Sequence, residues 1–132
     1  MTELIVCSTC RRPGTDRGAP ADGQRLLEAI EAALRAVPVP LTASSASPAP
    51  LRVRATACMS GCSRACTVAL QAAGKASYLF GELQPDAETA AQVLACARLH
   101  ALSADGQLDR AARPERLRNG ILARLPALAG PD

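Results

Sequence analysis

Aromatic side chains are scarce in this sequence of 132 residues, which has one tyrosine, Tyr78, one phenylalanine, Phe80, and no tryptophan. The interior must therefore be built from leucine, valine, isoleucine and many alanines, and small side chains each bury little apolar surface. A chain of this length can form one domain with a modest hydrophobic core. A bound metal ion or cluster would stabilise such a core, because the free energy of binding adds to that of folding.

Lysine and histidine are almost absent, since Lys75 and His100 are the only residues of their types. Arginine supplies nearly all the positive charge, and the formal net charge at pH 7 is only +3. A charge this small, without a basic face interleaved with aromatic residues, argues against nucleic acid as a partner. A Rieske-type cluster needs two histidine ligands, so we expect His100 to be a surface or packing residue.

No apolar segment approaches the length of a membrane-spanning helix, so we expect no membrane partner. The N-terminal residues MTELIVCSTC lack the basic stretch and apolar run of a signal peptide. These absences predict a cytoplasmic protein, in which clustered cysteines more often bind metal or do catalysis than form structural disulfides. No Ser-His-Asp set, Walker loop or H-E-x-x-H motif is present, which favours a carrier over an enzyme.

Hydrophobic patterning predicts alternating strands and helices. A short apolar strand covers residues 3–7, and residues 22–36 have helical periodicity that begins at Asp22, a good N-cap. Residues 51–57 alternate between apolar and polar side chains, as in a strand with one solvated face. The remaining predictions are a hairpin of strands at 67–73 and 76–83, and a helix from Pro85 to about residue 102.

This order is a βαβ unit followed by ββα, which is the order of a thioredoxin-like α/β fold with a mixed sheet flanked by helices. We expect residues 1–132 to form one domain, with a proline- and serine-rich loop at 37–50. The extension at 103–132 should contain one short helix that ends at Asn119-Gly120, and then an extended end. Its arginines form either a docking patch for an acidic partner or a solvated charged surface. They are Arg110, Arg113, Arg116, Arg118 and Arg124.

Five of the six cysteines fall into two groups. They are Cys7 and Cys10 in the segment CSTC, and Cys58, Cys62 and Cys66 in the segment CMSGCSRAC. The ends of parallel strands meet at one edge of a sheet, so sulfur atoms that follow the strands at 3–7 and 51–57 can converge. The sixth cysteine, Cys96, lies in the last long helix, where we expect it to serve packing.

Three kinds of site suit these thiols. A structural zinc site takes four ligands, often from two C-x2–4-C pairs, and Cys7/Cys10 and Cys58/Cys62 meet that spacing. A [2Fe–2S] or [4Fe–4S] cluster also takes four thiolates. A dithiol redox centre at Cys7 and Cys10 is less favoured, because a long loop separates Cys10 from the next helix. The thiols would then lack the helix N-terminus that lowers a thiolate pKa.

From Cys58 to about residue 95 the sequence resembles the thioredoxin-like [2Fe–2S] ferredoxins and the small [2Fe–2S] subunit of respiratory complex I. The shared features are CMSGC at 58–62, TVALQAA at 67–73, YLFG at 78–81 and PD at 85–86. The resemblance implies a [2Fe–2S] electron carrier that works between redox partner proteins and forms a homodimer. The implied ligands are Cys7, Cys10, Cys58 and Cys62.

Over nearly its full length the sequence also resembles a bacterial family of predicted metal-binding proteins of unknown function. The motifs are C-x2-C at 7–10, C-x3-C-x3-C-T-V-A-L at 58–70, G-K-x-x-Y-L-F-G at 74–81, and R-P…G-I-L-A-R-L-P between 113 and 126. Genes of that family often lie among cobalamin and cobalt genes, so the resemblance implies a redox step there. The alternative is a zinc- or cobalt-binding protein with a structural or metal-handling role.

Two departures from the ferredoxin pattern leave the fourth ligand open. The ferredoxins place more residues between their first two ligands than the two that separate Cys7 from Cys10, and they have a non-ligand where this chain has Cys66. Cys66 is therefore an alternative ligand to Cys10, or a thiol beside the cluster that tunes it.

Arginines flank both groups of thiols. They are Arg11, Arg12 and Arg64. Their guanidinium groups would offset the negative charge of a thiolate-bound cluster and raise its reduction potential. The alternative is that they only form the surface of an arginine-rich loop.

Overall fold

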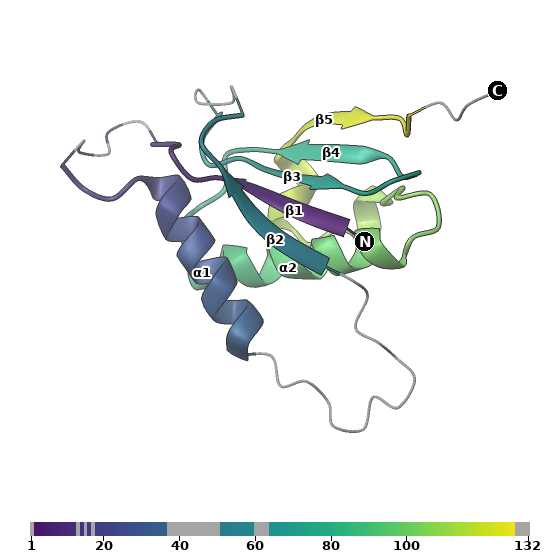
Figure 1. Ribbon diagram of the computed structural model, residues 1–132, viewed down its shortest axis with the longest axis horizontal. Coiled ribbons are helices and arrows are strands. Elements are labelled where there is room, and N and C mark those ends of the chain that lie inside the picture. Colours follow the sequence, from purple (N-terminus) through teal and green to yellow (C-terminus); the bar gives the residue numbers. More distant parts are fainter. Residues whose placement is uncertain are drawn as a thin grey trace.

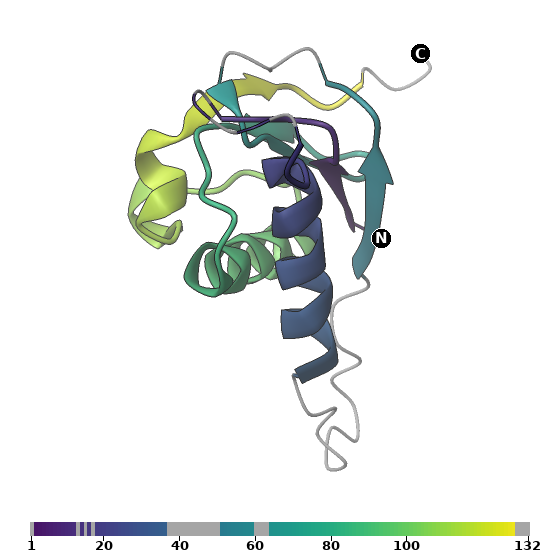
Figure 2. The same ribbon diagram turned by 90° about the vertical axis from the view of Figure 1, so that its left-hand side faces the viewer.

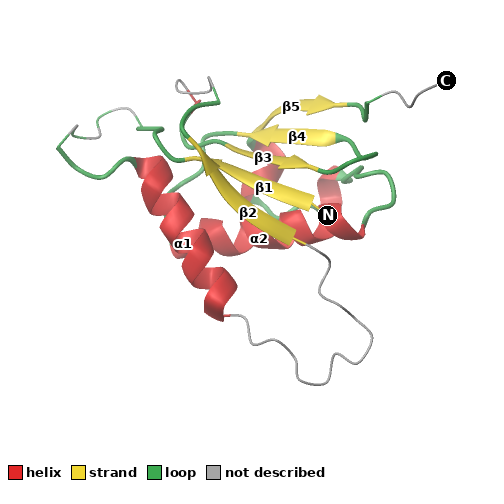
Figure 3. Ribbon diagram, viewed as in Figure 1, coloured by secondary structure: helices red, strands yellow, loops and turns green. Residues whose placement is uncertain are grey.

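The computed structural model describes residues 2–12, 14, 16, 18–36, 51–59 and 64–128. The chain forms a mixed α/β structure, as the sequence predicts (Figures 1 and 3). The elements in order are β1 (Thr2–Cys7), α1 (Asp22–Ala36), β2 (Leu51–Thr56), β3 (Val68–Gln71), β4 (Ser77–Phe80), α2 (Ala87–Leu102), the short 3-10 helix η2 (Arg110–Ala112), α3 (Arg116–Asn119) and β5 (Ile121–Leu125). The loop expected at 37–50 lies outside the described residues.

The described strands form one mixed sheet with the order β2-β1-β3-β4-β5 (Figure 1). β1 and β2 are parallel, in a register that runs from Thr2 opposite Leu51 to Cys7 opposite Thr56. The other neighbours are antiparallel. Because β1 and β2 run in the same direction, the chain leaves both strands at the same edge of the sheet.

Helices α1 and α2 pack against each other and against β1, and the helices gather on one side of the sheet (Figure 2). The main core lies between these two layers. Its largest fully buried members are Tyr78, Phe80, Leu4, Leu26, Ile30, Leu70, Leu83 and Leu94. Among the described residues, no helix combines the length and apolar character that crossing a membrane requires.

β1 is an interior strand of the sheet, and it is apolar on both faces. Leu4, Ile5 and Val6 in succession are buried, as expected for a strand that has neighbours on both sides. β2, by contrast, is an edge strand in which Arg52 and Arg54 are exposed. Arg54 forms an ion pair with Glu3 of β1. The predicted alternation of β2 therefore corresponds to an edge strand with one solvated face.

The start of α2 differs from the prediction. The helix begins at Ala87, and Pro85 precedes it. Asp86 is the N-cap, with an extended backbone (φ −129°), and its carboxylate accepts a hydrogen bond of 2.8 Å from the Thr89 N–H. This side chain satisfies an amide that has no partner within the helix, and the same bond lowers the pKa of Asp86. The hairpin strands β3 and β4 are also shorter than the predicted 67–73 and 76–83, because the outer residues of these ranges are not in strands.

The C-terminal extension forms a strand where only an extended end was expected. β5 pairs antiparallel with β4, and Leu125 lies opposite Ser77. The short helix α3 ends at Asn119, as predicted. The prediction missed β5 because ILARL is short and its partner strand is about forty residues earlier in the chain.

The arginines of this extension bind the chain itself. Arg118 Nε donates to the Arg113 carbonyl at 2.8 Å, and Arg113 is buried. The other contacts are Arg110 with Asn119 at 2.6 Å, Arg116 with Glu88 at 3.3 Å and Arg124 with Gln107 at 3.3 Å. These contacts favour a structural role over a free docking patch.

His100 is a packing residue of the core rather than a surface residue. Its ring is fully buried, Nε2 donates to the Ala76 carbonyl at 2.7 Å, and Nδ1 accepts from the Thr2 hydroxyl at 2.9 Å. A carbonyl can only accept, so Nε2 carries a proton. Burial lowers the pKa of His100, so the ring is neutral near pH 7 and Nδ1 is the acceptor in the bond with Thr2. The ring also lies edge-on to Tyr78, with centroids 6.2 Å apart. His100 thereby connects α2, the start of β1 and the residue before β4.

Stability of the metal-free protein should fall in mild acid because of His100. Burial, with the nearby charge of Lys75, holds the pKa of His100 below its ordinary value of 6.5. Between the folded and unfolded pKa values the unfolded chain binds more protons. The stabilisation is therefore complete above about pH 7.5 and decreases progressively as pH falls from 6.5 towards the lower folded-state pKa. Urea unfolding at a series of decreasing pH values through this range measures the effect.

The matched variants are His100→Gln and Asp105→Asn. His100→Gln should lower the free energy of unfolding at neutral pH by about 1–3 kcal/mol and flatten its pH dependence, because buried partners are lost and the titrating group is gone. Asp105→Asn should keep the wild-type slope, since the pKa of Asp105 lies below 3.8. An identical slope in wild type and His100→Gln would show that His100 is not the source.

Candidate metal centre

The end of β1 brings two sulfur atoms together. Cys7 is the last residue of the strand, and a turn at Ser8 and Thr9 leads to Cys10. The Cys10 thiol donates a hydrogen bond to Cys7 Sγ, and the two sulfur atoms are 2.9 Å apart. Both side chains are buried, with 0% and 1% of their surface exposed. The C-x2-C motif therefore forms a compact pair of thiols at the edge of the sheet.

The chain that follows β2 covers this pair. Cys7 and Cys10 form a small cluster with Ala65, and Met59 packs against it; we call these four residues the thiol cluster. Several contacts join the turn to the end of β2. The Ser8 N–H donates to the Thr56 carbonyl at 2.9 Å, and the Thr9 hydroxyl donates to the Ala57 carbonyl. The parallel pairing of β1 and β2 thus places residues 57–59 against the first cysteine pair.

The second pair of predicted ligands is Cys58 and Cys62, and the structure describes only Cys58. Cys58 follows β2 at the same edge as the thiol cluster, and its side chain is exposed. Cys62 lies outside the described residues. Within the part of the chain that the structure describes, no group of three or more His, Cys, Asp or Glu side chains is arranged to hold a metal ion. The described residues therefore supply two adjacent thiols, and a four-thiolate site needs Cys58 and Cys62 to approach them.

Cys66 and Cys96 have different surroundings. Both belong to the main core, and burial raises the pKa of each thiol to about 12. The negative charge of Asp22 further raises the pKa of Cys66. Cys96 is thus the packing residue that its position in the helix predicts. Of the two alternatives for the fourth ligand, Cys10 is the one whose sulfur atom contacts Cys7.

The N-terminus of α1 lies directly against the turn of residues 7–10, which we call the thiol turn. The Gly23 N–H donates to the Cys10 carbonyl at 2.9 Å. A Cβ atom on Gly23 would clash with the Cys7 carbonyl oxygen and would lie 3.2 Å from the Cys10 amide nitrogen. The expectation that the long loop separates the thiols from a helix N-terminus is therefore wrong. The loop returns on itself, so residues distant in sequence are in contact, and only glycine fits at this position.

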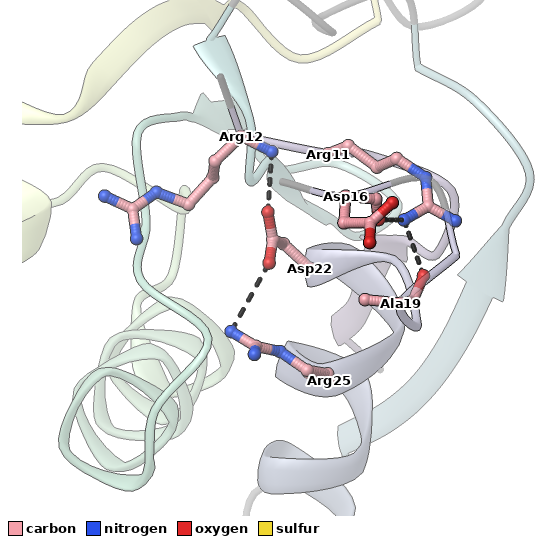
Figure 4. A network of polar contacts seen from close by, with 6 residues as sticks. All are labelled: Arg11, Arg12, Asp16, Ala19, Asp22 and Arg25. Carbon is pink, nitrogen blue, oxygen red and sulfur yellow. Dashed lines mark hydrogen bonds and ion pairs between the residues drawn. The ribbon is translucent and has the colours of Figure 1, made fainter. Parts of the chain in front are cut away.

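Polar contacts of Asp22 hold the returning loop (Figure 4). Asp22 is the first residue of α1 and is buried. Its carboxylate accepts from the Arg12 N–H at 2.6 Å and forms an ion pair of 3.3 Å with Arg25. A buried carboxylate needs such partners. These contacts join the residues after Cys10 to the first turn of the helix.

Two of the three flanking arginines are also bound to the chain. Arg11 donates to the Asp16 carbonyl at 3.0 Å and to the Ala19 carbonyl at 2.7 Å (Figure 4). Arg64 pairs with Glu82 at 3.0 Å on the surface. The Arg12 guanidinium points away from Asp22 (Figure 4), and its charge lowers the pKa of Cys66. Arg11 and Arg64 therefore serve the loop structure, and Arg12 supplies positive charge near Cys66.

The two thiols of the pair differ in acidity. Burial raises the pKa of Cys7, but hydrogen bonds from the Cys10 thiol and from the backbone N–H groups of Thr9 and Met59 outweigh it, so the pKa is lowered. For Cys10, burial and the bond that it donates to Cys7 raise the pKa to about 11. Hydrogen bonds to sulfur stabilise the charged form. Cys7 is therefore the more acidic thiol of the pair.

Two depressions of the described surface are lined by residues other than Cys7 and Cys10. One, of about 240 Å³, is on the sheet face opposite the helices and is lined by Met59, Ala69, Leu79, Ala123 and Leu125, among others. Another, of about 580 Å³, adjoins it around Gln71, Lys75 and Leu128. Met59 is the one residue that these depressions share with the thiol cluster.

The fold and the thiol turn define a small mixed α/β protein with a buried cysteine pair at one edge of its sheet. The sequence model of a family described as "Protein of unknown function (DUF1636)" matches residues 4–127, and the chain belongs to this family. The prediction that the chain belongs to a family of unknown function is therefore confirmed. No curated protein and no solved structure matches the chain significantly.

Replacing Gly23 by alanine should separate the thiol turn from α1. A Cβ atom has no room there, so we expect Gly23→Ala to lower the free energy of unfolding by about 1–3 kcal/mol. Cys7 and Cys10 should also react faster with iodoacetamide in the reduced, metal-free protein. Urea unfolding and mass spectrometry of the tryptic peptide of residues 1–11, which contains both cysteines, measure the two effects.

Gly18→Ala is the matched control. It lies in the same loop, and a Cβ atom there would meet Asp16 at an ordinary contact distance of 3.6 Å. The control should keep wild-type stability and wild-type alkylation rates. If the two variants behaved alike, the contact between α1 and the thiol turn would not hold the pair in place.

Proposed function

We propose that this protein is a thioredoxin-like [2Fe–2S] electron carrier whose cluster is held by Cys7, Cys10, Cys58 and Cys62. The observation that carries the proposal is the approach of Cys7 Sγ and Cys10 Sγ to 2.9 Å at the end of β1. Cys58 follows β2 at the same edge of the sheet. When bound, the cluster supplies a one-electron couple in which iron changes between the ferric and ferrous states.

The order of the elements supports the thioredoxin-like part of the proposal. β1, α1 and β2 form a βαβ unit with parallel strands, and β3, β4 and α2 follow as a ββα unit. β3 lies beside β1, so the two units form one sheet. In this arrangement the site lies at an edge of the sheet, where a redox partner protein can approach it.

The geometry of the pair suits two ligands of one metal. Thiolates that share a tetrahedral metal at about 2.3 Å lie about 3.8 Å from each other. Cys7 and Cys10, at 2.9 Å, would need to separate by only about 0.9 Å. The backbone N–H groups of Thr9 and Met59 lower the pKa of Cys7, and hydrogen bonds to ligand sulfurs are among the features that set a cluster's reduction potential.

The described residues around the cysteine pair support the proposed ligands. Met59 and Ala65 cover the sulfur atoms, which limits access of water. Arg12 provides positive charge near Cys66, because it lowers the pKa of that thiol. We therefore propose electron transfer between partner proteins. The homodimer and the connection with cobalt or cobalamin metabolism are further parts of the proposal that depend on the resemblance.

The test is the metal content and the spectrum of anaerobically purified protein. A red-brown protein with two iron and two sulfide per chain, bleached by dithionite and EPR-active when reduced, is the expected result. Each cysteine is then replaced in turn by alanine. Variants at 7, 10, 58 and 62 should lose the cluster, while Cys66→Ala and Cys96→Ala should keep it, because these two thiols lie in the main core.

Two outcomes would overturn the proposal. A colourless protein that contains one zinc ion per chain would establish the alternative, a zinc protein with a structural or metal-handling role. Loss of the cluster in Cys66→Ala together with its retention in Cys10→Ala would show that the ligand set is wrong.

A further inference from the structure

We propose that Cys7 and Cys10 form a reversible disulfide that competes with the metal for the same two sulfur atoms. In this scheme the metal centre can bind its metal only while both cysteines are reduced. The disulfide therefore prevents metal binding, and we call this effect the redox lock. The consequence for the metal rests on the proposed function. The disulfide itself is a property of this chain and can be measured without any metal.

The distance between the sulfur atoms carries this inference. At 2.9 Å they lie between the length of a disulfide bond, about 2.05 Å, and the separation of two thiolates on one metal, about 3.8 Å. Either state needs a change of only about 0.9 Å. Small side-chain rotations suffice for such a change, so neither state requires the fold to rearrange.

The surroundings of the turn hold the pair from two sides. On one side the Gly23 N–H binds the Cys10 carbonyl at 2.9 Å. On the other, Thr67 Oγ1 lies 3.6 Å from Cys10 Sγ, and the Cys7 N–H donates to the Thr67 carbonyl at 3.2 Å. These contacts join the turn to α1 and to the residue before β3. A turn held in this way keeps the two sulfurs adjacent whether or not a metal is present.

The covering segment controls access to the sulfur atoms. Cys7 and Cys10 are almost completely buried, and Met59 packs over them. Met59 is therefore one of the side chains that an oxidant must displace to reach Cys7. We therefore expect slow oxidation in the wild type and faster oxidation when Met59 is shortened to alanine.

The reaction is a thiol–disulfide exchange with a low-molecular-weight disulfide such as oxidised glutathione. Cys7 Sγ, as a thiolate, attacks one sulfur of the small disulfide; a mixed disulfide forms and one small thiolate leaves and takes up a proton. Cys10 Sγ then gives up its proton and attacks Cys7 Sγ, and the second small thiolate leaves and is protonated. The protein loses two electrons and two protons, and the small disulfide becomes two thiols.

The experiment uses the full chain, reduced and freed of metal by a chelator under anaerobic conditions. The protein is incubated with mixtures of oxidised and reduced glutathione, its free thiols are blocked with iodoacetamide, and tryptic peptides are weighed. The sequence suits this method, because residues 1–11 form one peptide with both cysteines, while Cys58 and Cys62 share the peptide 55–64. The expected product is peptide 1–11, two hydrogens lighter and unalkylated.

The second measurement is zinc affinity, with Zn²⁺ alone as the probe and a chromophoric chelator as competitor. Loss of a residue that merely supports a ligand weakens metal binding about 10- to 100-fold. Loss of two ligands should weaken it by at least that factor. The oxidised protein should therefore bind zinc more than about tenfold less tightly, and dithiothreitol should restore the affinity. Met59→Ala should oxidise faster than the wild type, and Cys96→Ala should match the wild type in both measurements.

The outcomes separate this inference from the proposed function. Full alkylation of peptide 1–11 under conditions that oxidise a control dithiol would overturn the lock, as would equal zinc affinity of the oxidised and reduced chains. A disulfide in peptide 55–64 alone would also overturn it. A colourless protein that binds zinc only when Cys7 and Cys10 are reduced would keep the lock and contradict the electron carrier.

Discussion

The parallel pairing of β1 with β2 places the ends of both strands at one edge of the sheet, and the chemistry of the thiols depends on it. Cys7 ends β1 opposite Thr56, so the chain that follows β2 crosses the turn between Cys7 and Cys10. An antiparallel pairing would put the two cysteine segments at opposite edges. The crossover helix α1 makes the parallel pairing possible, and its first turn rests on the same thiol turn.

Burial and local hydrogen bonds give the cysteines different pKa values. Cys66 and Cys96 lie in the main core, where burial keeps their thiols protonated. Cys7 and Cys10 are equally buried, but backbone N–H groups and the adjacent thiol stabilise a negative charge on Cys7. The hydrogen bonds to Cys7 favour its thiolate, and the thiolate is the form of cysteine that binds metals and takes part in thiol exchange. Hydrogen bonding to sulfur, rather than exposure, therefore distinguishes Cys7 from Cys66 and Cys96.

Most of the fold could be predicted from local patterns. The periodicity of residues 22–36 predicts α1, although Asp22, which was expected to be the N-cap, is the first residue of the helix. The apolar run before Cys7 predicts β1. β5 could not be predicted, because the edge strand is defined by its pairing with β4 and its own residues carry little signal. The start of α2 was placed too early, since Pro85 suits a first helical turn while the side chain of Asp86 provides the cap.

The sequence alone determined which residues could act: the spacing of Cys7 and Cys10, the second group from Cys58 to Cys66, and membership of the family. It also limited the partners through its low charge and few aromatic residues. Only the tertiary structure decided that Gly23 touches the thiol turn, that Cys10 meets Cys7, and that Cys66 belongs to the core. These facts depend on contacts between residues distant along the chain, which composition and local periodicity do not encode.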